Sequence, residues 1–315
     1  MQDNEIEQVI TIGAGPSALA AAIYTTREDI STTLYEKGPI GGLAAITDMV
    51  DNYPGFPEGI SGLKLAEQLE AQAKRFGAEI AYGEVSALRR EDDAVVLTVD
   101  GKEVKAQAVL IATGSDYSKL GIPGEAEYYG RGVHYCATCD GAFYRDKRLV
   151  VVGGGNSGVQ ETLFLTRFAS HIDLLVRSTV KASKVLQDDL QPYIDSGKVT
   201  VHLQTVPTEI AADEKGIVNA VKATKEGLDT EFSIDGVFVF IGLKPNTQFL
   251  AGSGVELDEL GLIKTNEKLE TNILGVFASG DVRSGATMQV ASAVGEGATA
   301  ALNIREYLND LKRAK

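Results

Sequence analysis

Cysteine and histidine are scarce in this chain, and the shortage limits the sites that it can build. The 315 residues include two cysteines and three histidines. A structural zinc site needs four ligands, usually from two cysteine pairs, and His134 is the one histidine close to the cysteines in sequence. We therefore predict no metal site, and we expect His134 to be a packing or surface residue near the cysteines.

Positive charge and long apolar runs are also in short supply. Thirty lysines and arginines stand against 44 aspartates and glutamates, so the formal net charge is −14. This acidity argues against nucleic acid and anionic membranes as partners. No apolar run reaches the roughly 18 residues that a membrane helix needs, so we expect no membrane partner. The content of 44% hydrophobic and 23% charged residues is ordinary for a globular protein, and the length suggests about two domains.

Residues 1–8 are polar and acidic, which is unlike a secretory signal. Two cysteines in a long chain with no targeting segment favour the reducing cytosol, where a disulfide is catalytic or sensory. We therefore expect a cytoplasmic protein.

The two cysteines that are present have C-x-x-C spacing. They read Cys136-Ala137-Thr138-Cys139-Asp140. Thiols at this spacing can close a tight, reducible disulfide, in which one thiol attacks and the other resolves. The sequence therefore predicts a redox centre at Cys136 and Cys139.

A glycine-rich turn near the N-terminus has the context of a dinucleotide-binding fold. The β-branched run 9–12 precedes a G-x-G-x-x-A motif at 13–18, and a helix of small residues follows at 19–24. This order brings backbone N–H groups and a helix N-terminus toward a pyrophosphate. The next strand, 32–35, ends in Glu36, and an acid at this distance suits a ribose 2′-hydroxyl. The combination favours a nucleotide site over an ordinary glycine turn.

A second fingerprint lies beyond the cysteines. Strand 148–152 leads into Gly153-Gly154-Gly155-Asn156-Ser157-Gly158, and a helical stretch follows at 159–168. The next strand, 172–176, ends in Arg177, and a cation there favours a 2′-phosphate over a bare ribose. Two fingerprints suggest two dinucleotides, of which FAD suits the acid-ended fold and NADPH the cation-ended one.

The pattern between the fingerprints predicts several further elements. Residue 24 is a tyrosine on the small-residue helix and is expected in the core, and the charged stretch 89–93 is expected to be a solvated turn. The remaining elements are a Gly- and Pro-rich segment at 38–57, an amphipathic helix at 63–76, alternating strands near 95–99 and 104–105, and a buried strand at 108–111.

Linkers at 115–124 and 242–246 flank the second fold, whose last strand is 237–241. The tail contains a strand running into an acid at 275–281 and a final helix from Ser292, and it is too short for a domain of its own. We therefore expect an α/β protein with two Rossmann-like dinucleotide-binding domains, the second inserted into the first. Two linkers at one junction permit a hinge.

Over nearly its full length the chain resembles low-molecular-weight thioredoxin reductases. The C-A-T-C-D run between two fingerprints is the most specific feature. The motifs that carry the resemblance are Gly13-Ala14-Gly15-Pro16, Gly41-Gly42, N-Y-P-G-F-P at 52–57, A-T-G at 112–114, I-P-G at 122–124, G-R-G-V at 130–133, C-A-T-C-D-G at 136–141, Gly153 to Gly158 and G-D-V at 280–282.

The resemblance implies a cytosolic, homodimeric flavoprotein disulfide reductase. Electrons would pass from NADPH through FAD to the cysteine pair, and on to thioredoxin or a similar small redox protein. Residues 1–115 and 246–315 would form the FAD domain, and residues 118–242 would form the NAD(P)H domain with the redox centre.

The resemblance also assigns roles to single residues. It implies that Cys139 lies against the flavin and that Cys136 attacks the acceptor's disulfide. Asp140 would carry a proton to or from the thiols, although a helix cap or turn residue is the simpler interpretation without the resemblance. Tyr24 would lie near the flavin. The implied FAD contacts are Gly13, Gly15, Pro16, Ser17, Ala18, Glu36, Lys37, Gly41, Gly42, Leu43, Asn52, Val85, Ala112, Thr113, Gly114, Gly280, Asp281, Met288, Gln289 and Val290. The implied NADPH contacts are Gly153, Gly155, Asn156, Ser157, Gly158, Arg177 and Lys181.

Several positions depart from the family's pattern. Leu43 replaces a usual Gln and Met288 a usual Arg, while Ala142 replaces the first of two Phe residues and thins the apolar docking surface for thioredoxin. The family usually has a cluster of cations that binds the 2′-phosphate of NADPH. Here Arg177 is retained, Ser178 replaces a second arginine, and Lys181 stands downstream. Arg and Lys are not equivalent for forked phosphate contacts, so NADH and ferredoxin are alternative donors. A non-enzymatic dithiol redox sensor is a further hypothesis, which the two fingerprints disfavour.

Overall fold

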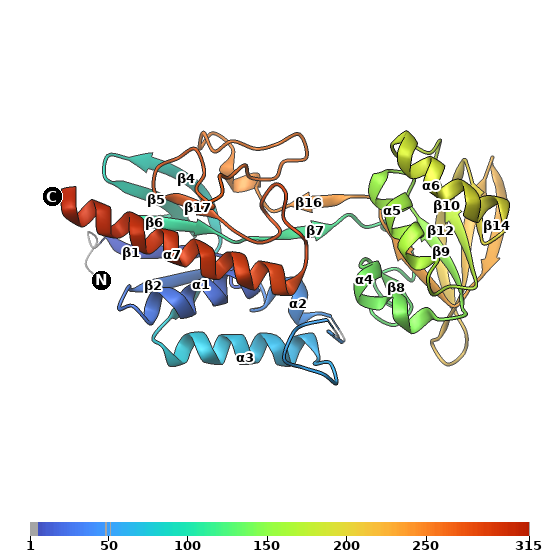
Figure 1. Cartoon of the computed structure of the whole chain (residues 1–315), viewed down its shortest axis with the longest axis horizontal. Coiled ribbons are helices and arrows are strands. Elements are labelled where there is room, and N and C mark those ends of the chain that lie inside the picture. Colours follow the sequence, from blue (N-terminus) through green and yellow to red (C-terminus); the bar gives the residue numbers. More distant parts are fainter. Residues whose placement is uncertain (1–5, 48, 51, 315) are drawn as a thin grey trace. The chain divides into compact units, whose positions relative to one another are not determined.

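The chain folds into two compact units joined by two short strands. The structure is a computed structural model that describes residues 6–47, 49–50 and 52–314. Residues 1–116 and 244–315 form the first unit, and residues 117–243 form the second. The connecting strands β7 (Ser115–Tyr117) and β16 (Leu243–Pro245) pair as a two-stranded sheet (Figure 1). The second unit is thus inserted into the sequence of the first.

A seven-stranded sheet forms the centre of the first unit, in the order β3-β2-β1-β6-β5-β4, with β17 also paired to β6. Its strands are β1 (Glu7–Ile12), β2 (Thr32–Glu36), β3 (Glu79–Tyr82), β4 (Val85–Glu91), β5 (Ala94–Val99), β6 (Lys102–Ile111) and β17 (Val276–Ala278). Strand β5 pairs antiparallel with residues 102–106 of β6, and β17 pairs parallel with residues 109–111. The C-terminal segment therefore completes the sheet of the first unit.

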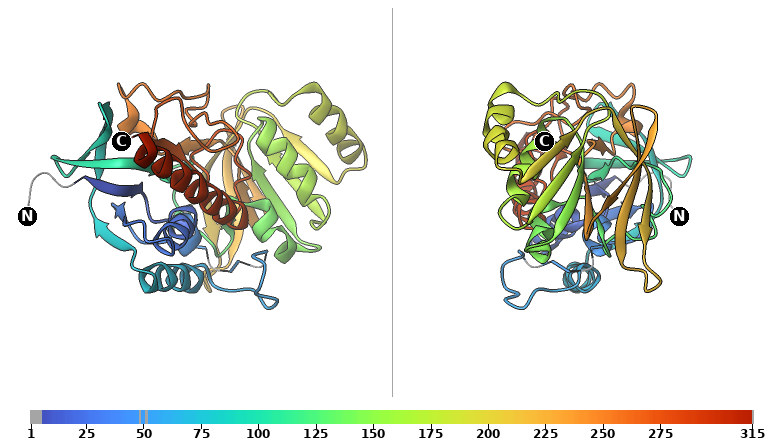
Figure 2. Two further views of the ribbon diagram at one scale, coloured as in Figure 1. Left: turned by 60° about the vertical axis from the view of Figure 1, so that its left-hand side comes forward. Right: turned by 90° about the vertical axis from the view of Figure 1, so that its right-hand side faces the viewer.

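Three longer helices, α1 (Pro16–Thr26), α3 (Gly62–Arg75) and α7 (Val290–Ala314), accompany this sheet. Helix α7 lies alongside α1 (Figures 1 and 2). Gly297 permits this close approach, because a Cβ there would collide with the backbone carbonyl of Ser17. The short helices α2 (Gly42–Ala45) and η2 (Gln248–Leu250), the latter a 3-10 helix, lie in the connections. None of the helices in the described ranges has the length and apolar character to cross a bilayer.

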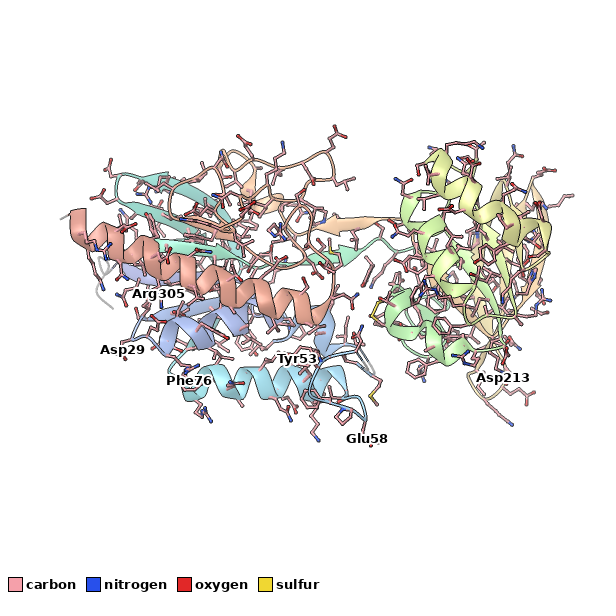
Figure 3. The ribbon with its side chains drawn as sticks, viewed as in Figure 1. Asp29, Tyr53, Glu58, Phe76, Asp213 and Arg305 are labelled. Carbon is pink, nitrogen blue, oxygen red and sulfur yellow. A yellow bond between two sulfur atoms is a disulfide. The ribbon has the colours of Figure 1, made fainter. Side chains whose placement is uncertain are left out.

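Two cores form because alternate residues of a strand face opposite sides of the sheet. Val9 and Leu110 pack with the helices in one core, whereas Ile10 and Val109 pack with β4, β5 and the C-terminal loops in the other. Tyr53, in the segment before α3, and Phe76, the C-cap of α3, are both packed against the helical core (both are labelled in Figure 3).

The second unit is built on a five-stranded sheet in the order β11-β10-β9-β15-β8, with all neighbours parallel. A three-stranded antiparallel sheet and the helices share separate cores with it. The strands are β8 (Val133–His134), β9 (Arg148–Val152), β10 (His171–Leu175), β11 (Val199–His202), β12 (Thr205–Ala212), β13 (Val218–Lys225), β14 (Leu228–Ser233) and β15 (Gly236–Val239). The helices are α4 (Ala137–Asp140), η1 (Gly141–Tyr144), α5 (Asn156–Leu165) and α6 (Lys184–Asp195).

The predicted fold class is confirmed, since each unit contains a strand, a glycine turn and a helix that leads to a parallel neighbouring strand. Three local predictions were wrong. The expected strands at 104–105 and 108–111 are one strand, β6, which pairs with β5 on one side and with β1 on the other. Of the expected turn at 89–93, residues 89–91 belong to β4, where Arg89 pairs with Glu91 and Glu103. Tyr24 is 41% exposed, although its neighbours Ile23 and Thr25 on α1 are buried.

Candidate functional site

The first fingerprint forms a tight turn between β1 and α1. Gly13 has a φ of +99°, and a Cβ there would lie 2.6 Å from the carbonyl oxygen of Ala112, so a side chain is excluded. A Cβ on Gly15 would meet nothing within 4 Å. Gly15 is also the N-cap of α1, and no described side chain caps this helix. The first-turn N–H groups are therefore free to bind an anion such as a pyrophosphate.

Glu36 ends β2 with its carboxylate beside this turn. The N–H of Ala14 donates to its Oε2 at 2.7 Å, and the N–H of Gly38 donates to its Oε1 at 2.7 Å. The carboxylate is held where the acid of a dinucleotide-binding fold meets a ribose. The βαβ unit, whose strands β1 and β2 pair in parallel, brings these groups together across 22 residues of sequence.

A cavity of about 380 Å³ opens next to Glu36. Its size is within the range of small-molecule and cofactor sites. Five of the predicted or motif residues line it, namely Gly13, Glu36, Lys37, Val85 and Thr113. The sequence analysis did not predict the other residues that line the cavity, which are Ile12, Tyr35, Gly83, Glu84, Ser86, Asn246, Gln248 and Phe249. Asn246 is held there by hydrogen bonds with the backbone and side chain of Thr113. Its position in a predicted linker was the one sequence feature that could have indicated a site residue.

The other predicted FAD residues follow the carboxyl ends of the same parallel strands. Ala112, Thr113 and Gly114 follow β6, and Gly280 and Asp281 follow β17. Ligands of open α/β sheets bind at this edge. The predicted residues Gly41, Gly42 and Leu43 lie at α2, and Val290 begins α7. Pro16, Ser17 and Ala18 form the first turn of α1.

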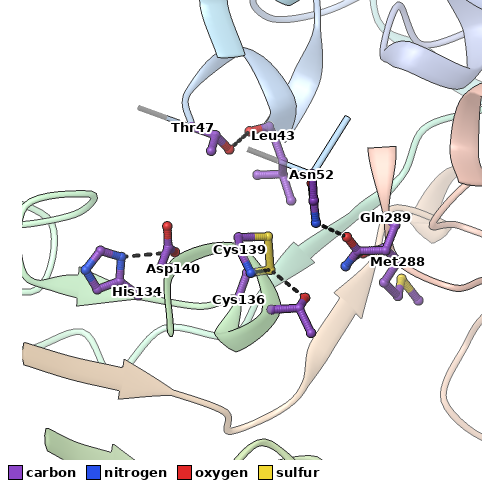
Figure 4. Close-up of a disulfide and its surroundings, with 10 residues drawn as sticks. Leu43, Thr47, Asn52, His134, Cys136, Cys139, Asp140, Met288 and Gln289 are labelled. Atoms are coloured by element: carbon purple, nitrogen blue, oxygen red, sulfur yellow. Dashed lines mark hydrogen bonds and ion pairs between the residues drawn. A yellow bond between two sulfur atoms is a disulfide. The ribbon is translucent and has the colours of Figure 1, made fainter. Parts of the chain in front are cut away.

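Two predicted contacts from distant parts of the chain meet in the first unit. The amide Nδ2 of Asn52 donates to Oε1 of Gln289 at 2.9 Å (Figure 4). Met288, next to it, has a φ of +57°, which is uncommon for a residue with a side chain. The bond links the 52–57 motif to the start of α7, so both can contribute to one binding surface.

Asp281 is a second carboxylate of this edge, and it is largely buried. Burial and the neighbouring Glu296 raise its pKa from 3.8 to about 6. Glu296 itself binds Arg283 in an ion pair and accepts from the N–H of Gly280 at 2.8 Å. A buried acid with a raised pKa is typical of functional sites.

The cysteines form a disulfide in the second unit (Figure 4). Cys136 and Cys139 have Cα atoms 5.3 Å apart, and Cys136 is the N-cap of α4. The N–H of Cys139 donates to Cys136 Sγ at 3.2 Å, and Thr138 Oγ1 is 3.4 Å from the same sulfur. Such donors favour the thiolate form once the disulfide is reduced.

Asp140 does not use its side chain as a cap for the following helix. Its Oδ2 lies 3.0 Å from Nδ1 of His134, and Nε2 of His134 lies 2.6 Å from the hydroxyl of Tyr144 (Figure 4 shows the first pair). His134 is a buried packing residue, 6% exposed. In the described part of the chain, no cluster of three or more His, Cys, Asp or Glu residues is arranged for a metal ion.

The second fingerprint repeats the geometry of the first. Gly153 has a φ of +144°, and a Cβ on Gly155, the N-cap of α5, would meet nothing within 4 Å. The N–H of Lys181 donates to the carbonyl of Gly154 at 2.7 Å, and Asn156 accepts from the N–H of Ser183. The segment after β10 therefore folds back onto the glycine turn. The predicted Ser157, Gly158 and Arg177 lie in the same unit, and Arg177 is exposed.

Comparison with known proteins agrees with this geometry. A family model described as pyridine nucleotide-disulphide oxidoreductase matches residues 7–297. A thioredoxin reductase of Bacillus subtilis is 41% identical over 99% of this chain and 98% of its own. One of Listeria monocytogenes is 40% identical over 99% and 97%. The crystal structure of a Streptococcus pyogenes thioredoxin reductase, 36% identical, superposes with a TM-score of 0.91 over 98% of this chain and 99% of that one.

The family resemblance seen in the sequence is thus confirmed. The family implies FAD and a pyridine nucleotide, which the two glycine turns can accommodate. With its Cys136–Cys139 disulfide, this chain belongs to the pyridine nucleotide-disulphide oxidoreductase family and is a flavoprotein disulfide reductase.

Proposed function

We propose that this protein is a cytoplasmic, homodimeric thioredoxin reductase that takes electrons from NADPH. The observation that carries the proposal is the Cys136–Cys139 disulfide at α4, on a unit with its own nucleotide fingerprint. The names of the relatives, thioredoxin reductase, support thioredoxin or a similar small redox protein as the acceptor. The scarcity of cysteine supports the cytosol, and the resemblance to the reductases supports the homodimer.

The first unit fits FAD. Glu36 would accept a hydrogen bond from the ribose, the N-terminus of α1 would bind the pyrophosphate, and Asp281 would accept from a hydroxyl. The open space at Gly15 and the cavity beside Glu36 support this assignment. When bound, FAD supplies the transfer of two electrons from a nicotinamide to the disulfide.

The cysteine pair carries the disulfide exchange. After two electrons break the Cys136–Cys139 bond, the Cys136 thiolate attacks one sulfur of the acceptor's disulfide and forms a mixed disulfide. Cys139 then attacks Cys136 Sγ, which restores the internal disulfide and releases the second acceptor thiol. Asp140, the residue after Cys139, takes the proton that leaves the attacking thiol and returns it to the departing sulfur. Phe143, 58% exposed and close in sequence, offers an apolar contact for the acceptor.

The second unit supports NADPH as the donor. Arg177 follows β10 at the position of a 2′-phosphate contact, and the backbone bond from Lys181 to Gly154 draws a second cation to the same turn. Ser178 stands where the family has another arginine. That single position favours the alternative of NADH or ferredoxin as donor.

Substitution of one thiol tests the proposal. Cys136→Ser should keep FAD bound and reducible by NADPH, because the nucleotide sites are unchanged, and it should abolish the reduction of thioredoxin. The measurement combines the flavin absorbance with NADPH consumption in the presence of oxidised Bacillus subtilis thioredoxin. Thr138→Ser, a matched change on the same turn, should retain turnover. Full thioredoxin reduction by Cys136→Ser would overturn the mechanism.

A further inference from the structure

His134 connects the redox turn to the core of the second unit. It ends β8 and pairs in register with Phe238 of β15. Its ring stacks on Phe238 with a centroid distance of 5.1 Å and meets the ring of Tyr144 edge-on at 5.2 Å. The ring is 6% exposed, so its orientation is set by packing on both sides. One of its nitrogens faces Asp140, and the other faces Tyr144.

The direction of the two hydrogen bonds follows from the chemistry of Tyr144. Burial, with contributions from Asp140 and Asp235, raises the pKa of Tyr144 well above its ordinary value. The hydroxyl therefore keeps its proton at neutral pH and can donate to Nε2 of a neutral imidazole. A neutral imidazole that accepts at Nε2 carries its own proton at Nδ1. Nδ1–H then donates to Oδ2 of Asp140 across 3.0 Å.

We propose that His134 is a positioning residue that holds the carboxylate of Asp140 at the redox turn. This inference rests on the proposed function. The ionised Asp140 accepts the proton of the attacking thiol, the thiolate breaks the acceptor's S–S bond, and the departing sulfur takes its electron pair together with that proton. The proton that leaves one sulfur thus reaches another, and His134 itself remains unchanged.

Other ionisable groups surround this network. Tyr129 has a pKa that burial and the charge of Asp140 raise. Asp235 accepts from the backbone N–H of Arg148 and pairs with Lys147. The elements next to α4 and η1 add Arg145, which lies over the ring of Phe168, and Glu161 of α5, whose pKa is raised by burial. Within the described part of the chain, His134 is the one basic side chain that lies at ion-pair distance from Asp140.

The chain contains a matched control. His202 is also half of a His–Asp pair in the second unit, with Nε2 2.8 Å from Oδ1 of Asp173, and its ring meets Phe232 edge-on. It lies on β11, away from α4 in the sheet order. His134→Phe and His202→Phe each keep an aromatic ring and remove one histidine–carboxylate bond. His134→Asn keeps a donor near the Nδ1 position.

The first measurement needs no turnover of the flavin. The protein is reduced with dithiothreitol, desalted anaerobically, and alkylated with iodoacetamide between pH 4.5 and 9. The unchanged protein and His202→Phe should show the same dependence of the alkylation rate on pH, and Asp140→Asn should alter it. In His134→Phe the profile should change toward that of Asp140→Asn, because the carboxylate has lost the donor that holds it at the turn. His134→Asn should restore most of the original profile.

The second measurement is a double-mutant cycle on thioredoxin reduction. We expect His134→Phe to lower kcat/KM about tenfold, in line with the loss of a hydrogen bond to a charged group. If His134 acts through Asp140, His134→Phe combined with Asp140→Asn should be no slower than Asp140→Asn alone. Should His134→Phe lose its FAD or its circular dichroism spectrum, Tyr144→Phe removes the bond to Nε2 and should move the profile in the same direction.

The outcomes separate the two proposals. A pH profile of His134→Phe that matches the unchanged protein, or losses that multiply in the double variant, would overturn the role of His134 while Cys136→Ser still shows a disulfide reductase. Thioredoxin reduction by Cys136→Ser would instead overturn the proposed function.

Discussion

Substitution of Asp281 should have opposite effects on two properties, the stability of the FAD-free protein and the retention of FAD. It follows β17, its backbone carbonyl accepts from Ser115 Oγ, and its carboxyl is buried near Glu296. Burial first, and then the charge of Glu296, raise its pKa from 3.8 to about 6. The folded protein thus binds this proton more tightly than the unfolded chain does. Above pH 6 the folded state must carry a charge that it accommodates poorly.

The sign and size of the effect follow from proton linkage. The free energy of unfolding falls as pH rises from about 4 to about 6, and the loss is complete above that range. A pKa that rises from 3.8 to about 6 corresponds to a loss of about 3 kcal/mol at pH 7.5 and about 1 kcal/mol at pH 4.5. Asp281→Asn removes the charge and should stabilise the FAD-free protein by up to these amounts. The same change should weaken retention of FAD, because a neutral amide replaces the carboxylate that would accept from the hydroxyl.

The assay is urea unfolding of the FAD-free protein at both pH values. The chain has no tryptophan, so circular dichroism is the suitable signal. Asp258→Asn is the control in the same unit, since hydrogen bonds from Ser284 and from the N–H groups of Leu262 and Leu260 outweigh burial and lower its pKa. That variant should destabilise at pH 7.5. A gain in Asp281→Asn that is equal at the two pH values, or a loss at pH 7.5, would refute the reasoning.

Two further predictions concern the nucleotide sites. Glu36→Arg should give largely colourless protein, because the ribose acceptor is replaced by a cation and the N–H groups of Ala14 and Gly38 lose their partner. Glu36→Gln should retain more FAD. Undiminished yellow colour of Glu36→Arg after gel filtration would contradict the assignment of Glu36 to the ribose. NADPH should reduce the flavin at lower concentration than NADH in an anaerobic titration, and Arg177→Ala should reduce this preference roughly tenfold to a hundredfold, as expected for one charge-assisted contact. Arg131→Ala, on the same unit, should leave it unchanged, and equal reduction of the unmodified protein by both donors would show that Arg177 does not bind a 2′-phosphate.

Patterns within short stretches of sequence predicted much of the fold. Glycines at positions that tolerate no Cβ, such as Gly13, identify the turns, and alternation of apolar residues identifies the strands. Glu36 could be predicted as a site residue because a βαβ unit has a nearly constant length, so an acid at the end of its second strand must lie beside the first turn. Cys136 and Cys139 are close enough in sequence for their spacing alone to predict the bond.

Only the tertiary structure decided the contacts between segments that are distant in sequence or that lie in different local environments. The bond from Asn52 to Gln289 spans 237 residues, and the approach of Asn246 to Thr113 spans 133. His134 is six residues from Asp140, yet their bond depends on β8, whose position is set by pairing with β15. Local sequence determines backbone conformation and the face of each side chain. The packing of whole elements determines which faces meet, and no short stretch of sequence contains that information.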